Sequence, residues 1–83
     1  MNKIIITISV PSIKREFDII VDLRIQISIL KKLLQDSIAD ITNGEYESSE
    51  NSLLCLSRRS IVLDEEKSAY ECGIENGDTI LLF

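Results

Sequence analysis

Apolar and polar residues alternate in two runs at the start of the chain. The first run is residues 3–10 (KIIITISV), the second is residues 13–22 (IKREFDIIVD), and both are rich in β-branched residues. Side chains point to alternate faces of a strand, so this period of two is typical of strands with one buried face. Pro11 and Ser12 separate the runs, and so short a break predicts a β-hairpin.

The spacing of apolar residues changes after residue 25. Apolar residues now recur every three or four positions, at Ile27, Leu30, Leu34, Ile38 and Ile41, with Leu33 widening the stripe. The opposite face carries Lys31, Lys32, Gln35, Asp36 and Asp40. This is the pattern of a helix with one apolar face, and Asn43-Gly44 suits its end because both residues tolerate a left-handed backbone.

Short elements fill the rest of the chain. The pattern predicts a polar loop at 45–52, strands at 53–57, 61–63 and 79–83, and one helical turn around 68–72 that Gly73 ends. The first and last strands can pair in parallel because the chain between them is long enough to cross over. The prediction is an α+β protein of the β-grasp class (β-β-α-β-β-β), a mixed five-stranded sheet in the order 2-1-5-3-4 packed on one main helix.

Length and charge narrow the class of protein. The 83 residues suffice for one domain with a modest core, so we expect a single domain over residues 1–83. The net charge of −5 argues against a nucleic-acid partner. No apolar run approaches the ~18 residues that span a bilayer, so direct membrane insertion is not expected. Cys55 and Cys72 are too few for a disulfide framework and indicate free thiols in a reducing compartment.

The residue types present do not favour catalysis. The chain has no histidine, which excludes Ser-His and Cys-His pairs. Two cysteines cannot hold an iron–sulfur cluster or, alone, a structural zinc ion. Cys72 lies near Glu71 and Glu75, whose charges disfavour a reactive thiolate, so we interpret it as a small packing residue. The sequence therefore predicts no catalytic residue, no cofactor and no metal.

The stretch CGIENGD, just before the last strand, resembles the same region of ubiquitin. The longer segment ECGIENGDTILLF, at residues 71–83, is similar to the C-terminus of the YukD/EsaB family. These small ubiquitin-like proteins are encoded with type VII (WXG100/Esx) secretion systems of Gram-positive bacteria. DIIVDLR, which leads into the helix through LKKLL, extends the resemblance over essentially the whole chain. One departure is Ala69, where ubiquitin-like folds place a larger aliphatic residue; we expect Tyr70 to fill that space.

The resemblance implies a cytoplasmic, non-conjugated accessory or regulatory protein that acts by binding other proteins. The implied partners are components of the membrane-bound secretion machinery, which would recruit it to the inner face of the cell membrane. Conjugated ubiquitin-like proteins and sulfur carriers need a mobile Gly-Gly tail, whereas this sequence stops at Phe83. The alternatives are a β-grasp adaptor unconnected with secretion and, less favoured, a sulfur carrier or protein modifier whose tail is missing here.

Alternation also predicts which side chains the helix leaves uncovered. Ile5, Ile20, Leu81 and Phe83 point to the face opposite the helix, with Leu53 and Cys55 beside them, and the strand order places them in one row. A contiguous exposed apolar patch of roughly a few hundred Å² usually marks a contact site, and ubiquitin binds partners through the equivalent face. The hypothesis is a docking surface for a protein partner or a second copy of the chain. The alternative is a tolerated patch interrupted by Lys3, Thr7, Glu16 and Asp22.

Overall fold

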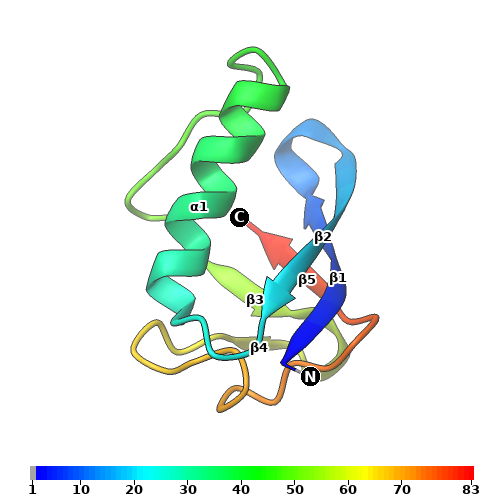
Figure 1. Cartoon of the computed structure of the whole chain (residues 1–83). Helices are drawn as coiled ribbons and strands as arrows, with labels where there is room; N and C mark the ends of the chain where they lie inside the picture. The colour runs from blue at the N-terminus through cyan, green and yellow to red at the C-terminus, as the bar shows by residue number, and fades with distance from the viewer. Residues whose placement is uncertain (1) are drawn as a thin grey trace.

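The computed structural model describes residues 2–83, which form a five-stranded sheet with one α-helix packed across it (Figure 1). The strands are β1 (Lys3–Val10), β2 (Arg15–Asp22), β3 (Leu54–Leu56), β4 (Ile61–Val62) and β5 (Thr79–Leu82). The helix α1 spans Ile27–Ile41, and two short 3-10 helices, η1 (Pro11–Ile13) and η2 (Ser57–Arg59), form turns between strands. The predicted element order is confirmed, although the last three strands are slightly shorter than predicted.

The sheet has the order β2-β1-β5-β3-β4, as predicted. β1 is antiparallel to β2 along its whole length, from Lys3 opposite Asp22 to Val10 opposite Arg15. β1 and β5 are parallel neighbours, whereas β3 is antiparallel to both β4 and β5. A parallel pair needs a long crossover, which α1 and the segments after it supply. β2 and β4 are therefore the two edges of the sheet.

The turn of the β1–β2 hairpin is longer than the alternation predicted. Pro11 lies in the first turn of η1, where its missing N–H breaks no helical hydrogen bond. The N–H of Lys14 donates to the C=O of Pro11 at 3.2 Å, and Lys14 adopts a left-handed φ of 54°. The second strand therefore begins at Arg15 rather than at Ile13.

The core lies between α1 and one face of the sheet. It is built from aliphatic side chains, including Ile27, Leu30, Leu34 and Ile38 of the helix and Ile6, Ile8, Leu54, Leu56, Ile80 and Leu82 of the sheet. Two members of the predicted helical stripe do not join it, because Leu33 and Ile41 are 54% and 58% exposed. Both lie beside β2, the edge strand, beyond which residues 2–83 provide no further strand to cover them.

Gln35 corrects the prediction of a uniformly polar outer helix face, because its side chain is buried. Its Nε2 donates to the C=O of Ser49 at 3.0 Å and to the Oη of Tyr46 at 3.3 Å. Tyr46 is itself buried in the core. The loop 45–52 therefore folds back over α1 and is held there by a residue the helical pattern assigned to solvent.

The turn at residues 68–73 also differs from expectation. Ala69 is fully buried, but Tyr70 is 73% exposed and does not fill the space beside it. The N–H of Ala69 donates to the C=O of Ile25 at 2.9 Å, and that of Tyr70 to Leu23 at 2.8 Å. These bonds hold the turn close to the chain that enters α1, which leaves room for a methyl group at residue 69 and directs the next side chain outward.

Candidate protein-interaction surface

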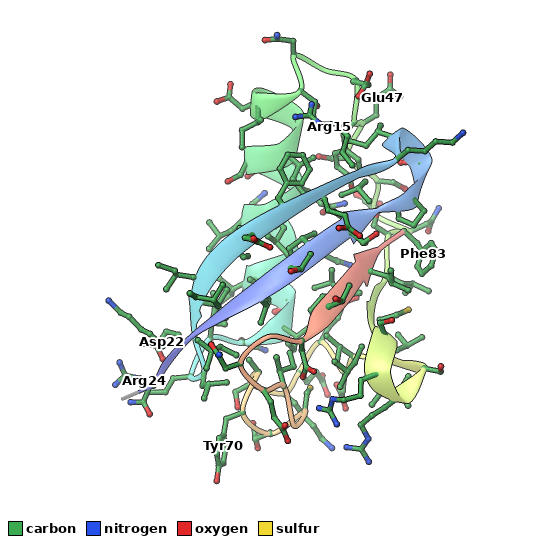
Figure 2. The ribbon with its side chains drawn as sticks, turned by 90° about the vertical axis from the view of Figure 1, so that its right-hand side faces the viewer. Arg15, Asp22, Arg24, Glu47, Tyr70 and Phe83 are labelled. Atoms are coloured by element: carbon green, nitrogen blue, oxygen red, sulfur yellow. The ribbon has the colours of Figure 1, made fainter. Side chains whose placement is uncertain are left out.

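Figure 2 looks onto the sheet face opposite α1, which we call the open face. Its side chains alternate with the core positions of each strand. All four residues predicted for the docking surface lie on this face. Ile5 is 52% exposed, Ile20 69% and Phe83 56%, whereas Leu81 is half-buried.

The register separates these four residues into two groups, so the expected single row is wrong. Ile5 lies directly opposite Ile20 in the β1–β2 pair, and we call these two the N-terminal pair. Leu81 lies opposite Ser9 of β1. Ser9 is four residues beyond Ile5 on the same strand, so about 13 Å separates the two positions. The physical reason is the parallel register of β5, which alternation alone does not fix.

A polar row lies between the two groups. Thr7 is opposite Asp18 on one side and Thr79 on the other. The Oγ1 of Thr7 donates to the Oδ1 of Asp18 at 2.7 Å. The open face therefore carries two apolar groups with a polar row between them.

The group that contains Leu81 and Phe83 is the larger one. Its members, which we call the C-terminal cluster, are Leu53, Cys55, Val62, Leu81 and Phe83. Leu81 and Val62 flank Cys55 on neighbouring strands, and the backbones of Phe83 and Leu53 exchange hydrogen bonds at 3.0 and 3.3 Å. Sequence analysis missed Val62, which is 56% exposed, because two residues of strand are too few to show an alternation.

A charged clamp fixes the turn that leads into β5. Arg58 donates from Nε and Nη2 to the two carboxylate oxygens of Asp78 at 2.9 and 3.0 Å, and from Nη2 to the C=O of Gly73 at 3.2 Å. Asp78 also accepts from the N–H of Glu75 at 2.7 Å. The bonds from Arg58 lower the pKa of Asp78, although burial opposes this. Arg58 therefore ties η2 to the turn before β5, although its side chain is 44% exposed.

The Cys72 thiol is not activated as a nucleophile. Burial raises the pKa of the Cys72 thiol, and its Sγ lies 3.9 Å from the C=O of Asp64. Within residues 2–83 no three His, Cys, Asp or Glu side chains gather where a metal ion would need them. Over the same residues, no helix has the length and apolar character needed to cross a membrane.

No protein-family profile matches the chain, and no curated protein is similar to it in sequence. Solved structures do share its fold. The ubiquitin-like domain of an Arabidopsis thaliana protein superposes with a TM-score of 0.72 at 28% identity, covering 100% of this chain and 78% of that one. The UBL domain of Plasmodium falciparum Dsk2 superposes with a TM-score of 0.74 at 21% identity, covering 96% and 95%.

A third similar structure is a chain of the MycP5-free ESX-5 inner membrane complex. It superposes with a TM-score of 0.80 at 13% identity, covering 100% of this chain and 21% of that one. Together with the strand order, these neighbours establish a ubiquitin-like β-grasp fold. Ubiquitin-like domains are in general non-enzymatic modules that bind other proteins.

Proposed function

We propose that this chain is a cytoplasmic, non-conjugated, non-catalytic accessory protein of a Gram-positive type VII secretion system. It binds a protein component of the membrane-bound machinery and is brought to the membrane by that partner. The observation that carries the proposal is the C-terminal cluster, a set of neighbouring apolar side chains on the open face of a ubiquitin-like domain. Exposed clusters of this kind usually mark contact sites.

Two further observations support the secretion context. The segment ECGIENGDTILLF resembles the YukD/EsaB proteins encoded with such systems. A chain in an ESX-5 inner membrane complex also contains a region of the same fold. That protein uses the fold within a membrane assembly, which is the setting proposed for this chain.

The test is affinity capture from the native cell with a tag before Met1, followed by mass spectrometry. The test variant carries Phe83→Glu and Leu53→Glu, both at exposed positions, so the fold should persist. The matched control is Ile5→Glu, since Ile5 is similarly exposed but belongs to the N-terminal pair. Circular dichroism and thermal unfolding of each purified variant confirm folding.

We expect wild type and Ile5→Glu to capture secretion-machinery subunits, and the double variant to capture roughly tenfold less, because central anchors dominate binding energy. Equal capture by a folded double variant would exclude the C-terminal cluster as the docking surface. Capture of proteins unrelated to secretion would favour the general adaptor. A covalent adduct or a bound activating enzyme would favour the modifier.

A further inference from the structure

Four exposed residues form a ridge along the side of α1 that faces away from the core. They are Ile29, Leu33, Asp36 and Asp40, and we call them the outer ridge. Ile29 is 52% exposed and Leu33 is 54% exposed. Their spacing of four, three and four residues places all four side chains on one side of a helix.

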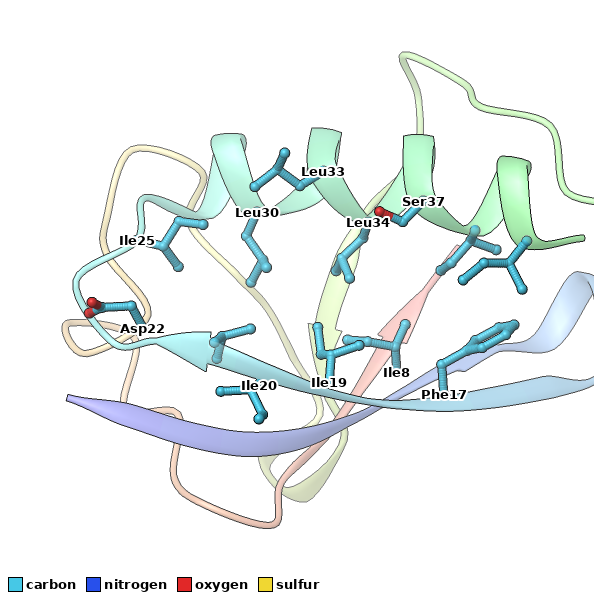
Figure 3. Close-up of a pocket in the computed structure, with 13 residues that line it drawn as sticks. Ile8, Phe17, Ile19, Ile20, Asp22, Ile25, Leu30, Leu33, Leu34 and Ser37 are labelled. Atoms are coloured by element: carbon cyan, nitrogen blue, oxygen red, sulfur yellow. The ribbon is translucent and has the colours of Figure 1, made fainter. Parts of the chain in front are cut away.

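The outer ridge is separate from the surfaces described so far. An apolar groove of about 290 Å³ lies between α1 and the edge strand β2 (Figure 3). Figure 3 shows Leu30 and Leu34 pointing from α1 toward the sheet, whereas Leu33 does not. Leu33 borders the groove, but the other three residues of the outer ridge do not line it. The C-terminal cluster lies on the opposite side of the sheet.

The spacing within the outer ridge is that of a coiled-coil seam. Seam residues recur alternately after three and four positions, and each inserts between side chains of a facing helix. A seam is usually apolar along its whole length, but here only the half that contains Ile29 and Leu33 is apolar. Asp36 and Asp40 make the other half acidic. The ridge therefore offers a helix-packing surface with a defined direction.

The two carboxylates have no counter-charge within residues 2–83. Neither Asp36 nor Asp40 makes an ion pair there, and Lys32, one turn before Asp36, does not pair with it. Asp40 lies in the last turn of α1, which contains no basic residue. The helix dipole disfavours negative charge at this end. A cationic side chain from another molecule would therefore stabilise this half of the ridge.

A second copy of the chain fits the outer ridge poorly. Antiparallel pairing of two copies of α1, with the ridges aligned, sets Leu33 opposite Asp36 and Ile29 opposite Asp40. This would press carboxylates against apolar side chains, which is costly. Parallel pairing sets each aspartate opposite its own copy, where like charges repel. The complementary surface must therefore belong to a different protein.

We propose that the outer ridge binds an amphipathic helix of a basic partner protein, packed antiparallel to α1. Two lysine or arginine residues near the start of the partner helix face Asp36 and Asp40. Two apolar residues further along its seam face Ile29 and Leu33. The antiparallel direction places the aspartates beside the N-terminal end of the partner helix, where the helix dipole favours negative charge. This site is independent of the C-terminal cluster, so either surface can be lost while the other still binds.

The test uses three helical peptides of about 20 residues, with capped ends and an alanine-rich background that favours helix. The first has lysine, lysine, leucine and leucine at its four seam positions, in that order. The second has the same composition with the seam order reversed, and the third has glutamate in place of lysine. Each is titrated to about millimolar concentration into isotope-labelled full chain, and amide shifts are followed by NMR.

We expect the first peptide to shift the resonances of α1 along the outer ridge. The reversed peptide should bind several-fold more weakly, because it can match the charges only in the parallel direction, which the helix dipole disfavours. The glutamate peptide should not bind, because it brings negative charge to Asp36 and Asp40.

Variants of the full chain locate the site. Ile29→Glu should weaken binding of the first peptide by roughly tenfold or more, because it places a charge in the apolar half of the ridge. Val62→Glu is the matched control, since Val62 is similarly exposed, at 56%, but lies on the edge strand β4. Asp36→Lys combined with Asp40→Lys should invert the preference between the lysine and glutamate peptides. Circular dichroism of each variant confirms that it is folded.

Three results would overturn the proposal. The first is that the lysine peptide shifts no resonance of α1, or shifts only those of the sheet. The second is that the reversed or the glutamate peptide binds as tightly as the first one, which would mean that the charge order of the ridge does not select. The third is a shift along the outer ridge that grows with protein concentration in the absence of peptide, which would assign the ridge to a second copy.

Discussion

Arg58 and Asp78 show how single residues position β5, the strand that carries Leu81. Their two hydrogen bonds tie η2 to the turn before β5, and Asp78 also caps that turn through the N–H of Glu75. A bidentate arginine–carboxylate pair fixes direction as well as distance. The clamp therefore holds the start of the strand that carries Leu81.

Replacing Asp78 with asparagine tests this clamp through pH. At pH 7 we expect Asp78→Asn to lower the free energy of unfolding by about 1–3 kcal/mol, because one oxygen that accepts hydrogen bonds becomes a donor. Because folding lowers the pKa of Asp78, its ionised form stabilises the fold fully above the unfolded pKa near 3.9 and loses this effect as pH falls through the folded value. Urea unfolding should therefore show that the difference in the free energy of unfolding between wild type and Asp78→Asn narrows below about pH 4. A gap that stays constant to low pH would contradict the assignment.

Gly77 carries a second local constraint. Its φ is +87°, and its N–H donates to the C=O of Ile5 at 2.7 Å, so the turn joins β1 to the approach of β5. An added Cβ would meet no atom within 4 Å, which leaves backbone strain as the cost of a side chain. Gly77→Ala should destabilise the protein by about 1 kcal/mol, and Gly77→Asn by less, because asparagine tolerates this backbone. Equal thermal unfolding temperatures for the two variants would argue against strain as the cause.

Among the elements, the hairpin could be predicted from two alternating runs around a short break, and the helix from a change of apolar period. The strand order followed from the β-grasp class that this element order indicates. The parallel register of β5 could not be predicted, since it depends on the turn at residues 73–78 and its bonds to Ile5 and Arg58. That register is what divides the predicted row into two groups. The buried contact between Gln35 and Tyr46 was also missed, because it joins a helix to a loop with no pattern of its own.

Gln35→Ala should release the loop 45–52 while leaving α1 intact. The loss of the bonds to Ser49 and Tyr46 should cost about 1 kcal/mol. A glutamate-specific protease should then cleave at Glu45, Glu47 or Glu50 faster than in wild type. Asp36→Ala, next to Gln35 but exposed, is the control and should not change the cleavage rate. Similar rates for both variants would show that Gln35 does not hold the loop.

The whole molecule has one sheet face covered by α1, an apolar cluster on the opposite face, and an apolar groove between α1 and β2. The fold and most of the core follow from the sequence pattern, although Leu33 and Ile41 of the helical stripe stay exposed. Similar solved structures confirm the ubiquitin-like architecture. Only the class of function, protein binding, could be predicted from the sequence. The binding surface could not, because it depends on which apolar residues become neighbours across strands. The pairing of Leu81 with Cys55, and of Cys55 with Val62, is such a case.

The most direct test of the docking claim is site-specific photocrosslinking in the native cell. A photoreactive amino acid is placed at Phe83 or Val62 in the C-terminal cluster, or at Glu47, an exposed position in the loop 45–52 that lies away from Phe83 in Figure 2. We predict adducts with a subunit of the secretion machinery from Phe83 and Val62 and none from Glu47. Absence of adducts at both cluster positions, or adducts only between two copies of this chain, would contradict the account.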